Sequence, residues 1–137
     1  MKAPVLPDLE EVLYRFENAL SELLRSEVLF VELIHQDLVA AGGKRIRPRL
    51  VFLSSRAIGG APFEMELALA VELLHSATLL HDDLIDEAET RRGKEAAFRK
   101  YGNAVSVLSG DFLLSRLLHV IAKTGRLELV EMFAETA

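Results

Sequence analysis

Residues 62–87 form the apolar stretch that most constrains the fold of this 137-residue chain. Leucine, alanine and valine occupy nearly every face of this stretch when its positions are placed at 3.6 residues per turn. A helix that is apolar on all sides must be surrounded by other elements. We therefore expect a central, buried helix over these residues.

Glycine and proline divide the rest of the sequence into further helical segments. Asp8 is a candidate N-cap for the first of them, with Glu11 as its capping-box partner. No stretch alternates for long with a period of two, and no Asn-Gly or Asp-Gly hairpin signal occurs. We expect one all-α domain with helices over 9–24, 28–41, 48–58 and 62–87, a short helix ending at 102, and helices over 103–124 and from 126.

Composition excludes several classes of function. The net charge of −5 argues against a general nucleic-acid binder, and the absence of cysteine excludes disulfides and thiolate metal sites. The N-terminal residues lack the apolar core of a signal peptide. Charges interrupt the apolar stretches, so we expect no stable membrane insertion and a cytoplasmic location.

The strongest chemical signal is a group of three carboxylates, Asp82, Asp83 and Asp86, at the end of the central helix. Asp82 and Asp86 are four residues apart and share a helix face, and His75 lies two turns earlier on that face. Carboxylates this close repel one another unless a cation lies between them, and their oxygens suit Mg²⁺. The alternative is a solvated acidic helix end.

Two basic segments complement these carboxylates. Residues 42–49, here called the basic segment, contain four cationic side chains behind a Gly-Gly pair and just before a helix N-terminus, which favours anions. Arg91 and Arg92 follow the acidic helix end in the sequence. Exposed basic loops are the alternative for each. Taken together, the charges suit a ligand that carries a diphosphate, with a metal on one side and guanidinium groups on the other.

Three segments, 42–50, 72–93 and 101–114, resemble in order and spacing the N-terminal half of the trans-isoprenyl diphosphate synthases, or polyprenyl synthetases. The resemblance covers residues 1–137 and implies half of an isoprenoid-synthase helical bundle. Asp82, Asp83 and Asp86 match the first aspartate-rich motif, in which Asp82 and Asp86 would ligate Mg²⁺ bound to the allylic diphosphate. The resemblance assigns the other substrate contacts as follows: Arg91 to that same diphosphate, and Lys44, Arg47, His75 and Arg92 to the diphosphate of isopentenyl diphosphate.

The implied activity is a prenyl transfer between these two substrates. The family's second aspartate-rich motif and a downstream lysine have no counterpart here, and Asp111 matches a recurrent aspartate whose role is left open. We therefore expect a truncated, fragmentary or split form of the enzyme. It would work as a homo-oligomer or with a complementing C-terminal chain, or it would be an inactive form that only binds diphosphate or a partner chain.

The resemblance also bears on product length. In the family, bulky residues four and five positions before the first aspartate close the pocket for the growing tail. Those positions here are the small residues Thr78 and Ala77. A long-chain polyprenyl product is therefore expected, with the floor of the pocket near Phe52 or Phe133.

Three other functions remain as alternatives. His81 and Asp82, with His35 and Asp111, could form an HD-type metal phosphohydrolase site. A class I terpene cyclase also uses an aspartate-rich helix but has no use for the basic segment. A helical interaction module without catalysis is the third.

Overall fold

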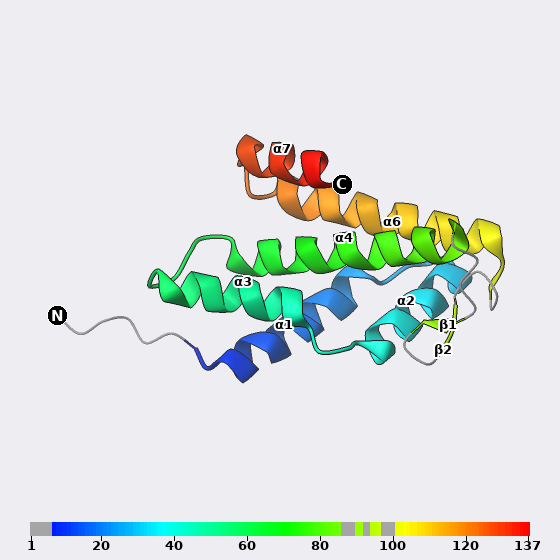
Figure 1. Cartoon of the computed structure of the whole chain (residues 1–137), viewed down its shortest axis with the longest axis horizontal. Helices are drawn as coiled ribbons and strands as arrows, with labels where there is room; N and C mark the ends of the chain where they lie inside the picture. Colours follow the sequence, from blue (N-terminus) through cyan, green and yellow to red (C-terminus); the bar gives the residue numbers. More distant parts are fainter. Residues whose placement is uncertain (1–6, 86–89, 92–93, 97–100) are drawn as a thin grey trace.

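A computed structural model describes residues 7–85, 90–91, 94–96 and 101–137, without the side chains of residues 30, 90, 91 and 94 (Figure 1). Within this part the chain is helical except for two short strands. The helices are α1 (Leu9–Leu23), α2 (Leu29–Ala41), α3 (Ile46–Ala57), α4 (Glu64–Ile85), α6 (Asn103–Ala122) and α7 (Leu127–Thr136). The strands β1 (Thr90–Arg91) and β2 (Lys94–Glu95) pair antiparallel, with Thr90 opposite Glu95.

Helix α4 is the centre of the bundle, as its apolar sequence predicts. It lies between α3 and α6 in Figure 1, and its contact with α6 is the most extensive between any two described elements. Helix α1 packs against α2, α3 and α4, and its Phe16 meets Phe52 of α3 edge to face at 6.4 Å between ring centroids. Both rings are buried together with Leu73 of α4 and Leu113 of α6, so one continuous core joins α1, α3, α4 and α6.

The structure confirms the all-α class and the order of the long helices, with several local differences. Helix α3 begins at Ile46, two residues earlier than expected, because Arg45 takes the N-cap position and Pro48 fits within the first turn. Asp8 occupies the N-cap of α1, but its side chain makes no capping hydrogen bond. Glu11 pairs with Arg15 at 2.6 Å instead, so the predicted capping box is wrong.

Two further expectations concern residues 86–102. The β1–β2 pair lies between the expected central helix and the expected short helix, where no strand was expected, and a ladder this short leaves no periodic pattern to read. The short helix expected before residue 102 falls largely on 97–100, outside the described residues.

Helix α6 is long and apolar enough to cross a membrane by length and composition alone, although two charged residues, Asp111 and Arg116, interrupt it as expected. Leu113, Leu117 and Ile121 of this helix are buried against the rest of the bundle. The core helix of a bundle satisfies the same criterion, so this match is weak support for a membrane span.

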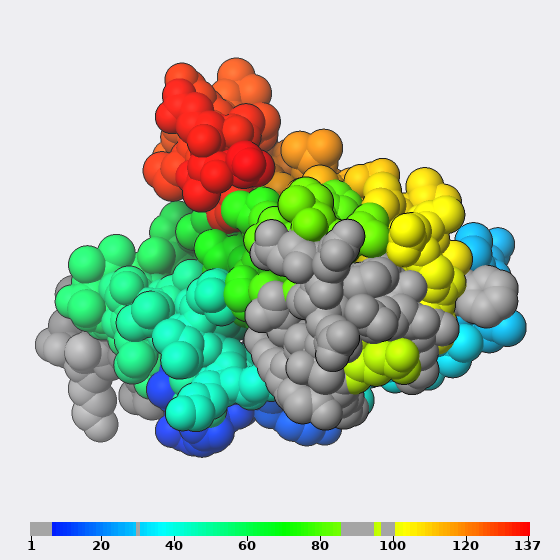
Figure 2. All heavy atoms as spheres, turned by 45° about the vertical axis from the view of Figure 1, so that its right-hand side comes forward, coloured from blue at the N-terminus to red at the C-terminus, as the bar shows by residue number. Residues whose placement is uncertain are grey.

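Helix α7 projects from the body formed by the other helices (Figure 2). Phe133 is its buried residue, and Leu127 and Met132 are largely exposed. One side of α7, with Met132 and Phe133, lines a groove together with α3 and α4, and Arg47 of the basic segment also lines it.

Candidate functional site

A groove between α3, α4 and α7 brings together two residues of the predicted diphosphate site. Arg47 from the first turn of α3 and His75 from the middle of α4 both line it, and its volume is about 450 Å³. Leu74, Met132 and Phe133 supply much of the remaining wall, which is mainly apolar. A second hollow of about 420 Å³ shares Met132 and Phe133 with the first. The groove thus offers a basic edge next to an extended apolar surface.

The basic segment divides into exposed and buried cations. Lys44 and Arg47 are exposed, whereas the Arg45 side chain is only 8% exposed. Its guanidinium donates from Nε to Glu17 Oε1 at 2.6 Å and from Nη1 to Glu72 Oε1 at 2.8 Å. Arg45 is therefore neutralised by carboxylates. Of the four cations in the basic segment, it is one that the family resemblance did not assign to a diphosphate.

The surroundings of Arg45 keep it charged. Burial by itself lowers the pKa of the guanidinium, but the hydrogen bonds and charges of Glu17 and Glu72 together raise the pKa above its ordinary value. Glu72 is 2% exposed, and one of its carboxylate oxygens, Oε2, has no hydrogen-bond partner among the described residues. The buried Glu72 carboxylate therefore needs the paired Arg45 guanidinium, because a buried charge without a partner destabilises the fold.

The acidic end of α4 is only partly described. Asp82 is exposed, Asp83 is buried at 5% exposure, and Asp86 lies outside the described residues. Among the described residues no group of three or more metal-ligating side chains could hold a metal ion. Of the two aspartates that the structure describes at this end of α4, Asp82 is the one whose carboxylate oxygens are accessible as hard ligands.

The same end of α4 is held against α6 by a close approach. His81 Nε2 lies 3.2 Å from the carbonyl oxygen of Val107 and 3.4 Å from Asp111 Oδ1. A β-carbon added to Gly110 would lie only 2.3 Å from His81 Nε2, so the ring uses the space that this glycine leaves. Asp111, whose role the sequence left open, thus lies beside the histidine that precedes the aspartates.

The second basic pair is described only in its backbone. Arg91 belongs to β1, with Lys94 of β2 as its partner, and its side chain lies outside the described residues. Arg92 lies outside them entirely. The predicted contacts of these two arginines therefore stay predictions.

The residues predicted to control product length occupy different environments. Ala77 is completely buried, and Thr78 is half-buried with its Oγ1 donating to the His75 carbonyl oxygen at 2.8 Å. Phe133 lines the groove, but Phe52 is buried against Phe16 and lines neither of the two hollows. Of the two aromatic residues considered for the floor of the pocket, the structure places only Phe133 at the groove.

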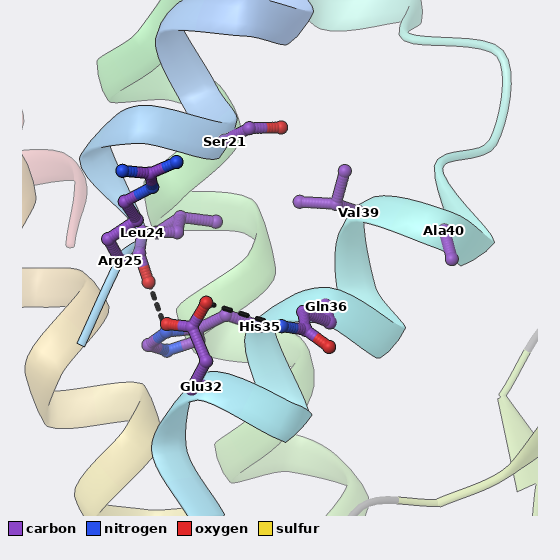
Figure 3. Close-up of a pocket in the computed structure, with 8 residues that line it drawn as sticks. All are labelled: Ser21, Leu24, Arg25, Glu32, His35, Gln36, Val39 and Ala40. Carbon is purple, nitrogen blue, oxygen red and sulfur yellow. Dashed lines mark hydrogen bonds between the residues drawn. The ribbon is translucent and has the colours of Figure 1, made fainter. Parts of the chain in front are cut away.

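His35 lines a separate pocket of about 300 Å³ between the end of α1 and α2 (Figure 3). Its ring is buried, its Nδ1 is 3.0 Å from the Leu24 carbonyl oxygen, and it stacks on Phe112. Burial lowers the pKa of His35, outweighing the carbonyls of Leu24 and Ser109 that favour protonation. Because His35 is engaged in these contacts rather than gathered with His81 and Asp82, the metal phosphohydrolase alternative is not supported.

Comparison with known proteins decides the family. The family model for polyprenyl synthetases matches residues 29–137. The chain belongs to the polyprenyl synthetase family. This match includes all three segments on which the resemblance was based, from the basic segment to α6.

Individual relatives within this family agree with the match. Octaprenyl diphosphate synthase of Escherichia coli (strain K12) is 41% identical over 118 residues, which are 85% of this chain and 36% of that protein. A short chain isoprenyl diphosphate synthase of Methanothermobacter thermautotrophicus is 41% identical over 97 residues, 70% of this chain and 30% of that protein. A crystal structure of polyprenyl synthase from Caulobacter crescentus CB15, complexed with calcium and isoprenyl diphosphate, matches with a TM-score of 0.86. It is 35% identical, and the match covers 98% of this chain and 43% of that chain. The chain spans less than half the length of each of these relatives.

Sequence reasoning missed three residues that shape the site: Glu17, Glu72 and Gly110. Glu72 carried a usable signal, because an isolated carboxylate in an apolar helical stretch needs a buried partner. Gly110 carried another, because glycine inside a helix destabilises it unless a close approach needs the space. Glu17 carried none, since a glutamate in an amphipathic helix is most often solvent-exposed.

Proposed function

We propose that the chain forms the diphosphate-binding part of a trans-prenyltransferase that condenses isopentenyl diphosphate with an allylic diphosphate. The observation that carries this proposal is the placement of Arg47 and His75, both assigned to isopentenyl diphosphate, along one groove with an apolar wall. Family membership supports it, as does the isoprenyl diphosphate bound to the Caulobacter relative.

The described residues suit the binding steps of this reaction. Lys44 and Arg47 would donate hydrogen bonds to phosphate oxygens, with lysine as a point charge and arginine as a two-pronged donor. Leu74 and Phe133 would exclude water from the hydrocarbon part of the substrate. The diphosphate of isopentenyl diphosphate stays on the product, so these contacts would hold that substrate in position for the attack. Electrostatic stabilisation of the departing allylic diphosphate would fall to Arg91 and to the bound cation.

The proposed chemistry breaks the carbon–oxygen bond of the allylic diphosphate and forms a carbon–carbon bond with the isopentenyl double bond. The diphosphate departs with the electron pair, and the product loses a proton to restore a double bond. Asp82 would hold Mg²⁺ together with Asp86 and substrate phosphates, and the calcium in the Caulobacter relative supports a divalent cation. Bound Mg²⁺ would neutralise the departing diphosphate.

Binding of isopentenyl diphosphate, measured by calorimetry, tests the proposal. We expect Arg47→Met to weaken affinity by about tenfold or more, since hydrogen bonds between charged groups contribute about 1.5–3 kcal/mol. Arg15→Met is the matched control, because Arg15 is an exposed arginine of α1 that pairs with Glu11. Equal affinity in both variants, or no binding to the unaltered chain, would refute the proposal.

Turnover distinguishes the active enzyme from the inactive binding form. We propose that activity needs a second copy of this chain or a complementing C-terminal chain. Large exposed apolar residues, which often mark interaction surfaces, support this proposal; they include Leu50, Ile58, Leu108 and Leu118. Light scattering together with an assay of radiolabelled product would show which assembly, if any, is active. Full activity of a monomeric chain would refute this part of the proposal.

We also propose a long-chain product for the assembled enzyme, on the basis of the small residues Ala77 and Thr78 and the octaprenyl synthase relative. Replacing completely buried Ala77 with phenylalanine would overpack the core, so half-buried Thr78 is the better position to test. Thr78→Phe should shorten the product, whereas Thr78→Val should leave its length unchanged. An unchanged product length in an active Thr78→Phe enzyme would contradict the proposed path of the tail.

A further inference from the structure

Arg45 lies in the chain between Lys44 and Arg47, which are exposed, but its own guanidinium is buried against Glu17 of α1 and Glu72 of α4. We propose that it is a positioning residue, which sets the basic segment against α4 so that Arg47 and His75 line the same groove. This inference rests on the proposed function of that groove. It assigns to Arg45 a role different from the phosphate contacts of Lys44 and Arg47.

The side chain of Arg45 joins three parts of the fold. It reaches Glu17 on α1 through two hydrogen bonds, from Nε at 2.6 Å and from Nη2 at 3.2 Å. It reaches Glu72 on α4 through Nη1 at 2.8 Å, and its guanidinium carbon lies 5.9 Å from the centroid of the Phe16 ring. A two-pronged contact fixes the orientation of the guanidinium as well as its distance, so α1 and α4 together define where Arg45 lies.

The backbone of Arg45 carries this constraint to the ligand-binding residues. Arg45 has a φ of 52°, in the left-handed region that a residue with a β-carbon rarely adopts. Its carbonyl oxygen accepts the hydrogen bond from the Arg49 amide at 3.0 Å and so starts α3. The side-chain contacts of Arg45 therefore hold an unfavourable turn that sets the first turn of α3 and, with it, Arg47.

Helix α4 carries both the partner of Arg45, Glu72, and the second groove residue, His75. Glu72 lies three residues before His75, about one turn along the same helix. A fixed distance between Arg45 and Glu72 therefore fixes the basic segment relative to His75. Lys44 is on the exposed side of the same turn, which leaves its ammonium group accessible to a ligand.

A charge-neutral double variant separates positioning from folding. Arg45→Met alone leaves buried Glu72 without its partner, whereas Arg45→Met with Glu72→Met removes one charge of each sign. Replacement of a buried ion pair by apolar residues is often neutral or stabilising. Half-exposed Glu17 can be solvated in that variant, because its side chain is 39% exposed.

The experiment measures the affinity for inorganic pyrophosphate by calorimetry and the thermal unfolding midpoint of each variant. We expect the single variant to lose both stability and affinity. We expect the double variant to recover its unfolding midpoint but to bind pyrophosphate about tenfold more weakly than the unaltered chain, since partners that orient a ligand-binding group commonly contribute 10- to 100-fold. The net charge of the double variant equals that of the unaltered chain, so long-range electrostatics does not account for such a loss of affinity.

A third variant, Arg45→Lys, keeps the charge but not the two-pronged geometry, and it should also bind pyrophosphate more weakly. Full affinity in either folded variant would overturn the inference and leave Arg45 a purely structural role. The Arg47→Met variant shows whether the inference about Arg45 alone has failed or the proposed function as well. If the unaltered chain does not bind pyrophosphate, or Arg47→Met does not weaken binding, the proposed function fails and the inference fails with it.

Discussion

The basic segment and the acidic end of α4 are held in place by different physical means. The basic segment is anchored by a buried guanidinium between two carboxylates, Glu17 and Glu72, at 2.6 and 2.8 Å. The acidic end is anchored by close packing, in which His81 fills the space over Gly110 and touches the Val107 carbonyl oxygen. The basic wall of the site, formed by the basic segment, therefore depends on charge pairing. The acidic wall, formed by the end of α4 around His81 and Asp82, depends on the volume of the side chains packed there.

This difference predicts opposite sensitivities. A buried ion pair tolerates the loss of both partners but not of one, because the remaining charge is left without compensation. A close helix–helix contact tolerates charge changes at its edge but not added atoms at its centre. Variants that remove charge should thus affect the basic wall most, and variants that add volume should affect the acidic wall most.

The largest expected effect is that of Arg45→Met on stability. Removing the guanidinium leaves Glu72 buried and unpaired, and breaking a buried pair in this way destabilises proteins by about 3–5 kcal/mol. Urea unfolding of Arg45→Met beside Arg49→Met measures this effect. Arg49 pairs with Glu10 at 3.2 Å in a partly exposed position, so its loss should change the free energy of unfolding by less than about 1 kcal/mol. Equal effects would show that charge does not anchor the basic wall.

The next largest effect is expected from Gly110→Ala. The new β-carbon would lie 2.3 Å from His81 Nε2, so the ring must move and lose its contact with Val107. We expect a net loss of about 1–2 kcal/mol, because overpacking commonly costs about 1–3 kcal/mol and alanine gains up to about 1 kcal/mol in helix propensity.

A double-mutant cycle with His81→Ala identifies the cause of that loss. In the His81→Ala background the added methyl group has room, so Gly110→Ala should be neutral or stabilising there. An unchanged penalty in the double variant would show that His81 is not the group displaced, and the description of the acidic wall as a packed contact would be wrong.

Much of the fold follows from the sequence, because helix formation here depends on local spacing. The apolar pattern of residues 62–87 predicted the central helix, and the glycine pairs at 42–43 and 59–60 predicted the ends of α2 and α3 to within one residue. The β1–β2 pair was missed, since two-residue strands carry no periodicity. The N-cap of α3 was missed because a non-glycine residue in the left-handed region contradicts the usual preference, and long-range contacts stabilise it.

The site was less accessible to sequence reasoning. Arg45 and Arg47 are the same residue type two positions apart, and local pattern does not distinguish them. What separates them is Glu17, which is 28 positions from Arg45 in the chain, and Glu72, which is 27 positions away. Pairings over such distances are a property of the assembled helices. The family resemblance assigned Lys44 and Arg47, and not Arg45, to a diphosphate, but the residue types alone could not show that Arg45 would be buried between two carboxylates.

The pH dependence of stability offers a smaller effect that sharpens the comparison. The folded chain holds the pKa of His35 below its ordinary value because the ring is buried, so the unfolded chain binds this proton more readily. Stability from His35 is fully present above its unfolded pKa, about 6.5, and is lost as the pH falls from there toward the lowered folded value. His35→Gln should therefore lose less stability than the unaltered chain between pH 6.5 and acid, as measured by urea unfolding at several pH values.

The contribution of Arg45 provides the internal control for that measurement. Its pKa is raised above an already high value, so its ion pairs keep a charged guanidinium throughout this range. The double variant Arg45→Met with Glu72→Met should consequently show the same loss of stability on acidification as the unaltered chain. Arg45→Met alone does not serve here, because protonation of its buried, unpaired Glu72 would relieve the uncompensated charge. If instead His35→Gln retained the full acid loss, another group would be responsible.

The smallest effect is expected for Asp111→Asn, at the edge of the packed wall. Asp111 Oδ1 lies 3.4 Å from His81 Nε2, but its side chain is 57% exposed, so water and salt screen the pair. Exposed pairs contribute about 0.2–1 kcal/mol, and asparagine keeps the shape and one oxygen acceptor, so the free energy of unfolding should change by less than about 0.5 kcal/mol. Urea unfolding at low and high salt, with Glu72→Gln as the buried counterpart, measures both walls in one experiment. Glu72→Gln should be clearly more destabilising, because it weakens the charge pairing of a guanidinium that is only 8% exposed. A loss for Asp111→Asn as large as that for Glu72→Gln would mean that charge anchors both walls, and the division between a charge-held and a volume-held side of the site would not stand.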